Sequence, residues 1–101
     1  MFSLESIIST LQTYFQDKPI SRAWIFGSYA RGDQTPSSDI DILVSYDDGF
    51  RPGLLGIVKI IQELEETLNL KVDLVEEGTL YPYIANEVEA QKIKIYERIN
   101  P

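Results

Sequence analysis

Apolar residues recur along this chain at two spacings, one typical of amphipathic helices and the other of strands. Helical spacing predicts three helices, over residues 3–15, 54–68 and 82–90, and Ser3 is expected to be the N-cap of the first. The longest of the three presents one apolar stripe, which is formed by Leu54, Val58, Ile61, Leu64 and Leu68.

Short apolar runs between turn residues predict strands over residues 22–26, 39–45 and 71–75. Trp24, within the first run, is expected to be a core residue. Residues 92–97 alternate polar and apolar, which leaves open a short closing strand and a continuation of the last helix. Strands that alternate with helices predict an α/β unit of two or three layers.

Two carboxylates one residue apart open the second predicted strand. Side chains at positions i and i+2 of a strand lie on one face, so Asp39 and Asp41 are expected side by side. Aspartate is depleted in strands, and like charges on one face repel each other. A hard cation such as Mg²⁺ would remove that repulsion, while a solvated strand end is the alternative for an isolated Asp-x-Asp. The opposite face of this strand is expected to be buried through Ile40, Ile42 and Val44.

A glycine turn follows the first predicted strand. Gly27 and Ser28 end an apolar run and precede residues 29–31, which are expected to form one helical turn. Glycine lets the backbone approach a ligand closely, and free N–H groups at the start of a helical turn suit a phosphate. The Ser28 hydroxyl would add a donor and Arg31 a positive charge. Gly-Ser alone also fits an ordinary strand-to-loop turn, but its combination with the aspartate pair is much more specific.

Together these residues resemble the nucleotidyltransferase superfamily that includes DNA polymerase beta. The family pattern is Gly-Ser, a segment of about ten residues, and Asp-x-Asp. Its finer form is matched here by Gly27-Ser28-Tyr29-Ala30-Arg31-Gly32 and by Ser38-Asp39-Ile40-Asp41. The chain is most similar to the minimal nucleotidyltransferases of the MntA-like antitoxin type. These are single-domain proteins often paired with a HEPN-family protein in toxin–antitoxin systems.

The resemblance implies an α/β fold with a small mixed β-sheet and helices packed mainly on one face, which leaves the other face open for a nucleotide. Residues 1–101 are expected to form this single domain. The family carries a third carboxylate on a neighbouring strand, and the matching position is Asp73. Strand alternation places Asp73 on the face opposite Leu70, Val72 and Leu74, whereas the rivals Glu76 and Glu77 lie beyond that alternation.

The resemblance also implies a chemistry. Asp39, Asp41 and Asp73 would be the catalytic residues and would hold two Mg²⁺ ions, with ATP as substrate. Gly27 and Ser28 would position its phosphates, as Arg31 would, while Ser38 would either contact a phosphate or only begin the strand. The implied activity is transfer of AMP to a hydroxyl of a HEPN-family toxin, with a tyrosine the expected acceptor, so the chain would be its antitoxin. The alternative is a catalytically silent module that neutralises its partner by contact.

Composition narrows the partners and the chemistry. The 101 residues include no cysteine and no histidine, which excludes disulfides, thiol nucleophiles, imidazole bases and the usual zinc ligands. The net charge of −7 disfavours a nucleic-acid substrate and favours a basic protein partner. No apolar run reaches the ~20 residues of a membrane span, and no signal peptide is apparent, so we expect a cytoplasmic protein without membrane contact. Whether it forms a homo-oligomer is left open.

The remaining acidic and aromatic residues are interpreted as structural. Glu63, Glu65 and Glu66 are expected on a solvated helix surface, and Asp47 and Asp48 are expected in a turn. The aromatic pair before and within the last predicted helix could stack on a base, but core or rim packing is the expectation for Tyr81 and Tyr83.

Overall fold

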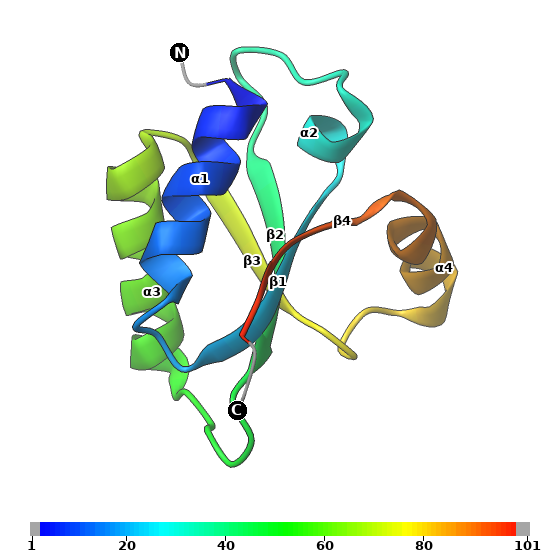
Figure 1. The fold of residues 1–101 in the computed structure, drawn as a ribbon. Helices are drawn as coiled ribbons and strands as arrows, with labels where there is room; N and C mark the ends of the chain where they lie inside the picture. The colour runs from blue at the N-terminus through cyan, green and yellow to red at the C-terminus, as the bar shows by residue number, and fades with distance from the viewer. Residues whose placement is uncertain (1–2, 99–101) are drawn as a thin grey trace.

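The computed structural model describes residues 3–98, in which helices and strands alternate along the chain (Figure 1). In chain order the elements are α1 (Leu4–Phe15), β1 (Ile20–Phe26), α2 (Ser28–Arg31), β2 (Ile40–Tyr46), α3 (Leu54–Leu68), β3 (Val72–Glu76), α4 (Pro82–Gln91) and β4 (Ile93–Glu97). The pattern at residues 92–97, open between strand and helix, is therefore a strand.

The four strands form one mixed sheet in the order β3-β2-β1-β4. β1 lies antiparallel to both β2 and β4, while β2 and β3 run parallel and are connected through α3. A parallel connection of this kind needs a crossover, which α3 supplies. The expected α/β fold with a small mixed sheet is confirmed.

Helices cover the two faces of the sheet unequally. α1 and α3 lie together on one face, and α4 lies on the other (Figure 1). The larger core cluster fills the first face, where Ile40, Ile42 and Val44 are fully buried as the alternation predicts. On the second face, Val88 of α4 packs with Trp24 and Leu43 in a smaller cluster. That face is thus only partly open, because α4 covers its middle.

The apolar stripe predicted on α3 is wrong over its first turns. Leu54 is 77% exposed and Val58 is 40% exposed, whereas the buried positions are Ile60, Leu64 and Leu68. Only the later turns of α3 pack in the main core, so Leu64 and Leu68 are buried as predicted, while the first turn of the helix faces solvent. Among residues 3–98 no helix combines the length and the apolar character that crossing a membrane requires.

Local signals place most of the element ends. The Ser3 hydroxyl accepts a hydrogen bond from the Ser6 N–H at 3.1 Å, as expected of an N-cap. α3 ends at Asn69, whose backbone is left-handed with φ of 54°, a conformation that asparagine tolerates. β1 begins at Ile20, earlier than predicted, because this residue is fully buried and pairs with Tyr46.

The unequal burial along α3 yields a first prediction. Leu64→Ala should lower the free energy of unfolding by about 2–5 kcal/mol, because it empties a fully buried site. Leu55→Ala, the matched control at a side chain that is 84% exposed, should change it by less than about 0.5 kcal/mol. Urea denaturation measures both, and equal losses would contradict this packing.

Candidate active site

The parallel pairing of β2 with β3 brings acidic side chains from two separate segments together. Asp41 is the register partner of Asp73, so the two side chains lie on the same face of neighbouring strands. Asp39 lies just before the first residue of β2, where the Ile40 N–H donates to the Lys71 carbonyl at 2.9 Å. The structure therefore places all three predicted carboxylates at one end of this strand pair.

Asp41 is the least exposed of the three carboxylates and carries the electrostatic cost of the arrangement. Its pKa is raised to about 6, chiefly by burial and next by the charge of the neighbouring Asp73 and hydrogen bonding with it. Asp39 adds a smaller contribution in the same direction, and only Arg31 opposes it. The proton on Asp41 is thus held more tightly than on an ordinary aspartate.

The Gly27 turn lies directly against this carboxylate. Gly27 has φ of 72° and ψ of −151°, which a residue with a side chain rarely adopts. A Cβ atom at this position would collide with Oδ2 of Asp41. Gly27 precedes the one-turn helix α2, whose buried Tyr29 anchors it in the main core. The predicted helical turn is present, and its start lies beside the acidic cluster.

The other two predicted nucleotide contacts differ in their surroundings. Arg31, on α2, donates to Asp33 at 3.1 Å and to Gln91 at the end of α4 at 3.2 Å, so it bridges α2 and α4 near Asp41. The Ser38 hydroxyl instead accepts from the Thr35 N–H at 2.9 Å, which closes the loop before β2. This hydroxyl is therefore occupied in shaping the loop.

The donor set suits a hard divalent cation in its chemistry. Carboxylate oxygens are the ligands that Mg²⁺ prefers in proteins, and a cation would relieve the repulsion recorded in the raised pKa of Asp41. Within residues 3–98, however, no three acidic side chains already converge closely enough to form a metal cage. Asp39, Asp41 and Asp73 are neighbours that do not form such a cage in this structure.

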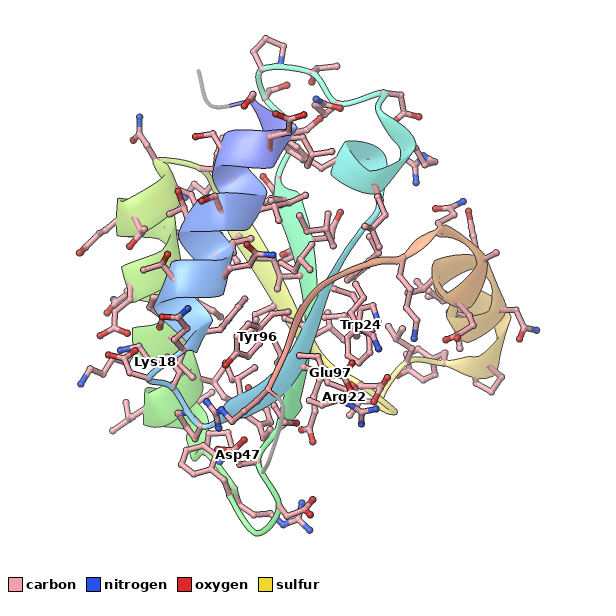
Figure 2. The ribbon with its side chains drawn as sticks, in the orientation of Figure 1. Lys18, Arg22, Trp24, Asp47, Tyr96 and Glu97 are labelled. Atoms are coloured by element: carbon pink, nitrogen blue, oxygen red, sulfur yellow. The ribbon has the colours of Figure 1, made fainter. Side chains whose placement is uncertain are left out.

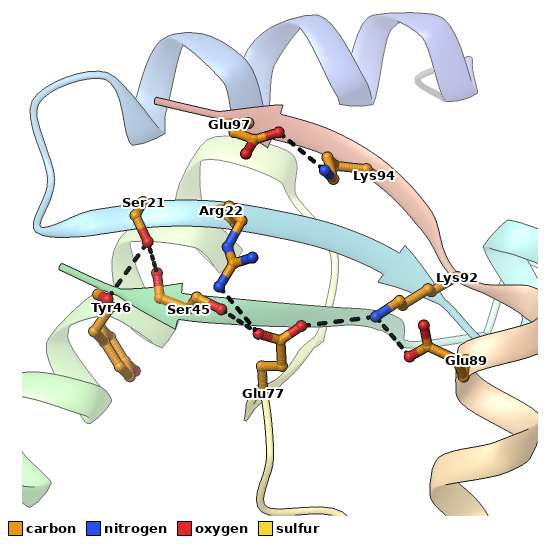
Figure 3. A network of polar contacts seen from close by, with 9 residues as sticks. All are labelled: Ser21, Arg22, Ser45, Tyr46, Glu77, Glu89, Lys92, Lys94 and Glu97. Carbon is orange, nitrogen blue, oxygen red and sulfur yellow. Dashed lines mark hydrogen bonds and ion pairs between the residues drawn. The ribbon is translucent and has the colours of Figure 1, made fainter. Parts of the chain in front are cut away.

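The rival third ligands lie elsewhere. Glu76 ends β3 opposite Val44, three register positions beyond the Asp73 pair. Glu77 accepts from the Ser45 hydroxyl at 2.7 Å and forms ion pairs with Arg22 and Lys92 at 3.5 and 3.7 Å (Figure 3). Its charge is therefore balanced by two cations, and neither glutamate joins the acidic cluster.

The Glu77 network fixes α4 on the sheet, a role that sequence patterns did not indicate. Lys92, directly after α4, lies over the Trp24 ring at 4.5 Å from its centroid, and Arg22 lies over the same ring at 5.6 Å. Figure 2 shows Arg22 and Trp24 on the α4 side of the sheet, with Lys18 and Tyr96 on the side of α1. Such contacts contribute about 0.5–2 kcal/mol each.

Several residues interpreted as surface have defined partners. Glu63 accepts from the Tyr14 hydroxyl at 2.7 Å, and Glu65 accepts from the Val72 N–H at 3.0 Å, so only Glu66 of the three is an exposed surface acid. Asp47 binds Arg98 through both carboxylate oxygens, at 2.8 and 2.6 Å, and so ties the loop after β2 to the end of β4.

Tyr81 and Tyr83 are not core residues. Their side chains are 68% and 77% exposed, and their rings stack on each other with centroids 5.9 Å apart. They lie at the start of α4, whereas Gln91 at its other end contacts Arg31. A helix of this length separates the two ends by about 15 Å, which places the tyrosines away from the acidic cluster.

The Gly-Ser turn beside paired carboxylates agrees with comparison to known families. The family described as the Nucleotidyltransferase domain matches residues 4–95. The chain belongs to this family. It is therefore an enzyme of the nucleotidyltransferase class by family, as the sequence motif implied.

Known relatives extend the comparison. A Thermococcus cleftensis protein named protein adenylyltransferase MntA is 36% identical over 92 residues, covering 87% of this chain and 91% of that protein. A Methanocaldococcus jannaschii protein, provisionally named a protein adenylyltransferase, is 42% identical over 72 residues, covering 70% and 72%. A crystal structure described as a toxin–antitoxin with AMP-PNP is 25% identical with a TM-score of 0.75, covering 90% and 73%.

Contact between Gly27 and Asp41 yields a second prediction. Gly27→Ala should destabilise the fold by more than the about 1–3 kcal/mol of backbone strain, because the new methyl group also displaces the Asp41 carboxylate. Gly32→Ala is the matched control, since Gly32 has a similar φ of 83° and nothing within 4 Å of its missing side chain. Urea unfolding compares them, and equal losses would show that the Asp41 contact costs nothing.

The raised pKa of Asp41 yields a third prediction, for metal-free buffer with EDTA. The folded pKa of about 6 lies above the unfolded value of about 3.9, so the folded state binds this proton more tightly. This contribution is complete below about pH 4 and is lost as the pH rises through about 6. The stability of the native chain relative to Asp41→Asn should therefore fall between about pH 4 and 7. A difference that stays constant across that range in urea titrations would contradict the shift.

Proposed function

We propose that this chain transfers the adenylyl group of ATP to a hydroxyl group of a partner protein, with Mg²⁺ as cofactor. The proposal is supported chiefly by one juxtaposition, in which the Asp41 carboxylate touches the Gly27 turn and is paired with Asp73. A phosphate placed at this turn would lie beside a concentration of negative charge. Magnesium bridges such a pair of anions, carboxylate and phosphate, in nucleotide enzymes generally.

Each part of the cluster has a separate task in this proposal. The backbone at Gly27 and Ser28 would hold the terminal phosphates, because the first N–H groups of a helix lack intrahelical partners. Arg31 would add positive charge there. Asp39, Asp41 and Asp73 would hold a pair of magnesium ions, which supply charge neutralisation of the nucleotide and of the departing pyrophosphate when bound.

Asp73 is the proposed base. It is exposed at the edge of the cluster, where an acceptor hydroxyl of another molecule could reach it. The acceptor oxygen would attack the α-phosphorus, its proton would pass to Asp73, and the bond to the bridging oxygen of pyrophosphate would break. The products would be an adenylylated acceptor and pyrophosphate.

For the acceptor we propose a tyrosine of a HEPN-family toxin, with this chain as its antitoxin. Support comes from the named activity of the relatives and from the likeness to a toxin–antitoxin structure. The net charge of −7 favours a basic protein over a nucleic acid as partner.

A labelled transfer experiment tests the proposal. The native chain, ATP labelled at the α-phosphate, Mg²⁺ and a HEPN-family toxin as the proposed partner should yield labelled partner. Asp39→Ala combined with Asp41→Ala should abolish the label, because the carboxylates that hold the metal are gone. Mass spectrometry of the product identifies the modified residue and so tests tyrosine directly.

Asp73→Asn separates catalysis from folding in the same assay. Because Asp73 is exposed and its charge repels Asp41, Asp73→Asn should leave an unfolding free energy at neutral pH equal to or above that of the native chain, together with loss of transfer. Full activity of this variant would remove Asp73 from the mechanism. Neutralisation of the partner by the Asp39→Ala, Asp41→Ala double variant, without transfer by the native chain, would instead support a binding module.

A further inference from the structure

The contact between Glu65 and the first residue of β3 has no part in the mechanism above, yet it lies next to Asp73 in the chain. Oε2 of Glu65 accepts a hydrogen bond from the Val72 N–H at 3.0 Å. We propose that Glu65 is a positioning residue for nucleotidyl transfer. It would act by fixing the position of β3 along the strand axis, and so the position of the Asp73 carboxylate. This inference rests on the proposed function.

The hydrogen-bond pattern of the parallel pair explains why this N–H needs a partner. Ile40 is the register partner of Val72, and its N–H donates to the carbonyl of Lys71. In a parallel ladder such a residue bonds the two neighbours of its partner, so the polar groups of Val72 point away from β2. β3 is an edge strand, and within residues 3–98 no further strand lies on that side. The Glu65 carboxylate satisfies a donor that the sheet cannot.

Glu65 also fixes the start of the connection between α3 and β3, through its backbone. Its backbone carbonyl accepts the Asn69 N–H at 2.8 Å, which ends the helix. Only Leu70 and Lys71 separate Asn69 from Val72, so the backbone and the side chain of one glutamate fix both ends of the connection. The connection from α3 to β3, the strand that carries Asp73, is therefore short, and two hydrogen bonds to Glu65 fix it.

Glu65 adds a tie on the side of β3 that has no strand partner, since β2 holds the strand from the other side only. The strand has five residues and one neighbouring strand. A register slip of one residue would turn Asp73 toward the core and Val72 toward solvent, away from Asp41. A smaller shift along the strand would still misplace the carboxylate, and a misplacement of about 1 Å can cost about 100-fold in rate.

Four variants distinguish the effect of the length of the Glu65 side chain from the effect of its charge. Glu65→Asp keeps the charge but shortens the side chain by one methylene, while Glu65→Gln keeps an acceptor oxygen at the original reach. Glu65→Ala removes both, and Glu66→Ala is the matched control at an exposed neighbour. We measure kcat and the KM for ATP in the labelled transfer reaction, together with amide hydrogen exchange at Val72 by NMR.

The expected result is a fall in kcat of about 10- to 100-fold for Glu65→Asp and Glu65→Ala, with the KM for ATP within about twofold and faster exchange at Val72. Glu65→Gln should stay within about threefold of the native kcat, as should Glu66→Ala. Should Glu65→Ala fail to fold, the aspartate and glutamine variants carry the comparison. Native kcat in Glu65→Asp, or equal impairment of Glu65→Gln and Glu65→Asp, would overturn the inference.

Failure of the two proposals can be told apart. If the native chain transfers no label, the proposed function fails by itself. Amide hydrogen exchange at Val72 then still tests whether Glu65 holds β3 in place. Slow exchange that persists in Glu65→Asp would show that β3 does not depend on Glu65.

Discussion

The parallel pairing of β2 with β3 is the constraint on which the site depends. It sets Asp41 opposite Asp73, although the two residues are separated by a loop, a long helix and a corner. Burial of Asp41, together with the like charge that the pairing brings beside it, raises the pKa of Asp41 to about 6. The apolar face of the same strands, with Ile40, Ile42 and Val44 fully buried, offsets that electrostatic cost. The core thereby holds in place an arrangement that its charges oppose.

Sequence patterns could predict most of the fold because strand alternation and helical spacing are local properties. Asp73 was placed on the correct face by alternation alone, and Gly27 was singled out by the turn that it forms. What local patterns could not supply was the extent of each helix that meets the rest of the molecule. Leu54 and Val58 match the helical period as well as Leu64 does, yet only Leu64 reaches the sheet.

Polar side chains were the least predictable, because their partners are distant in the chain. Glu63, Glu65 and Glu66 look alike in a helical pattern, and only the fold shows that the first two meet Tyr14 and Val72. Ser38 is similar, since the sequence left open a phosphate contact or a role at the start of the strand, and only the fold shows that its hydroxyl also accepts from the Thr35 N–H. Nothing in the local sequence distinguishes a glutamate that solvates a helix from one that completes a sheet edge.

Charge balance divides the α4 face of the sheet into two halves with different capacities. At one end Glu77 lies between Arg22 and Lys92, both of which also lie over the Trp24 ring, so acid and base compensate each other. At the other end Asp41 lies beside Asp39 and Asp73, and the Arg31 charge that opposes their effect is itself paired with Asp33. Acidic side chains thus outnumber this cation at the aspartate end. Since the compensated half has no need of a cation, the aspartate end is where a divalent ion gains most, and that end also carries the Gly27 turn.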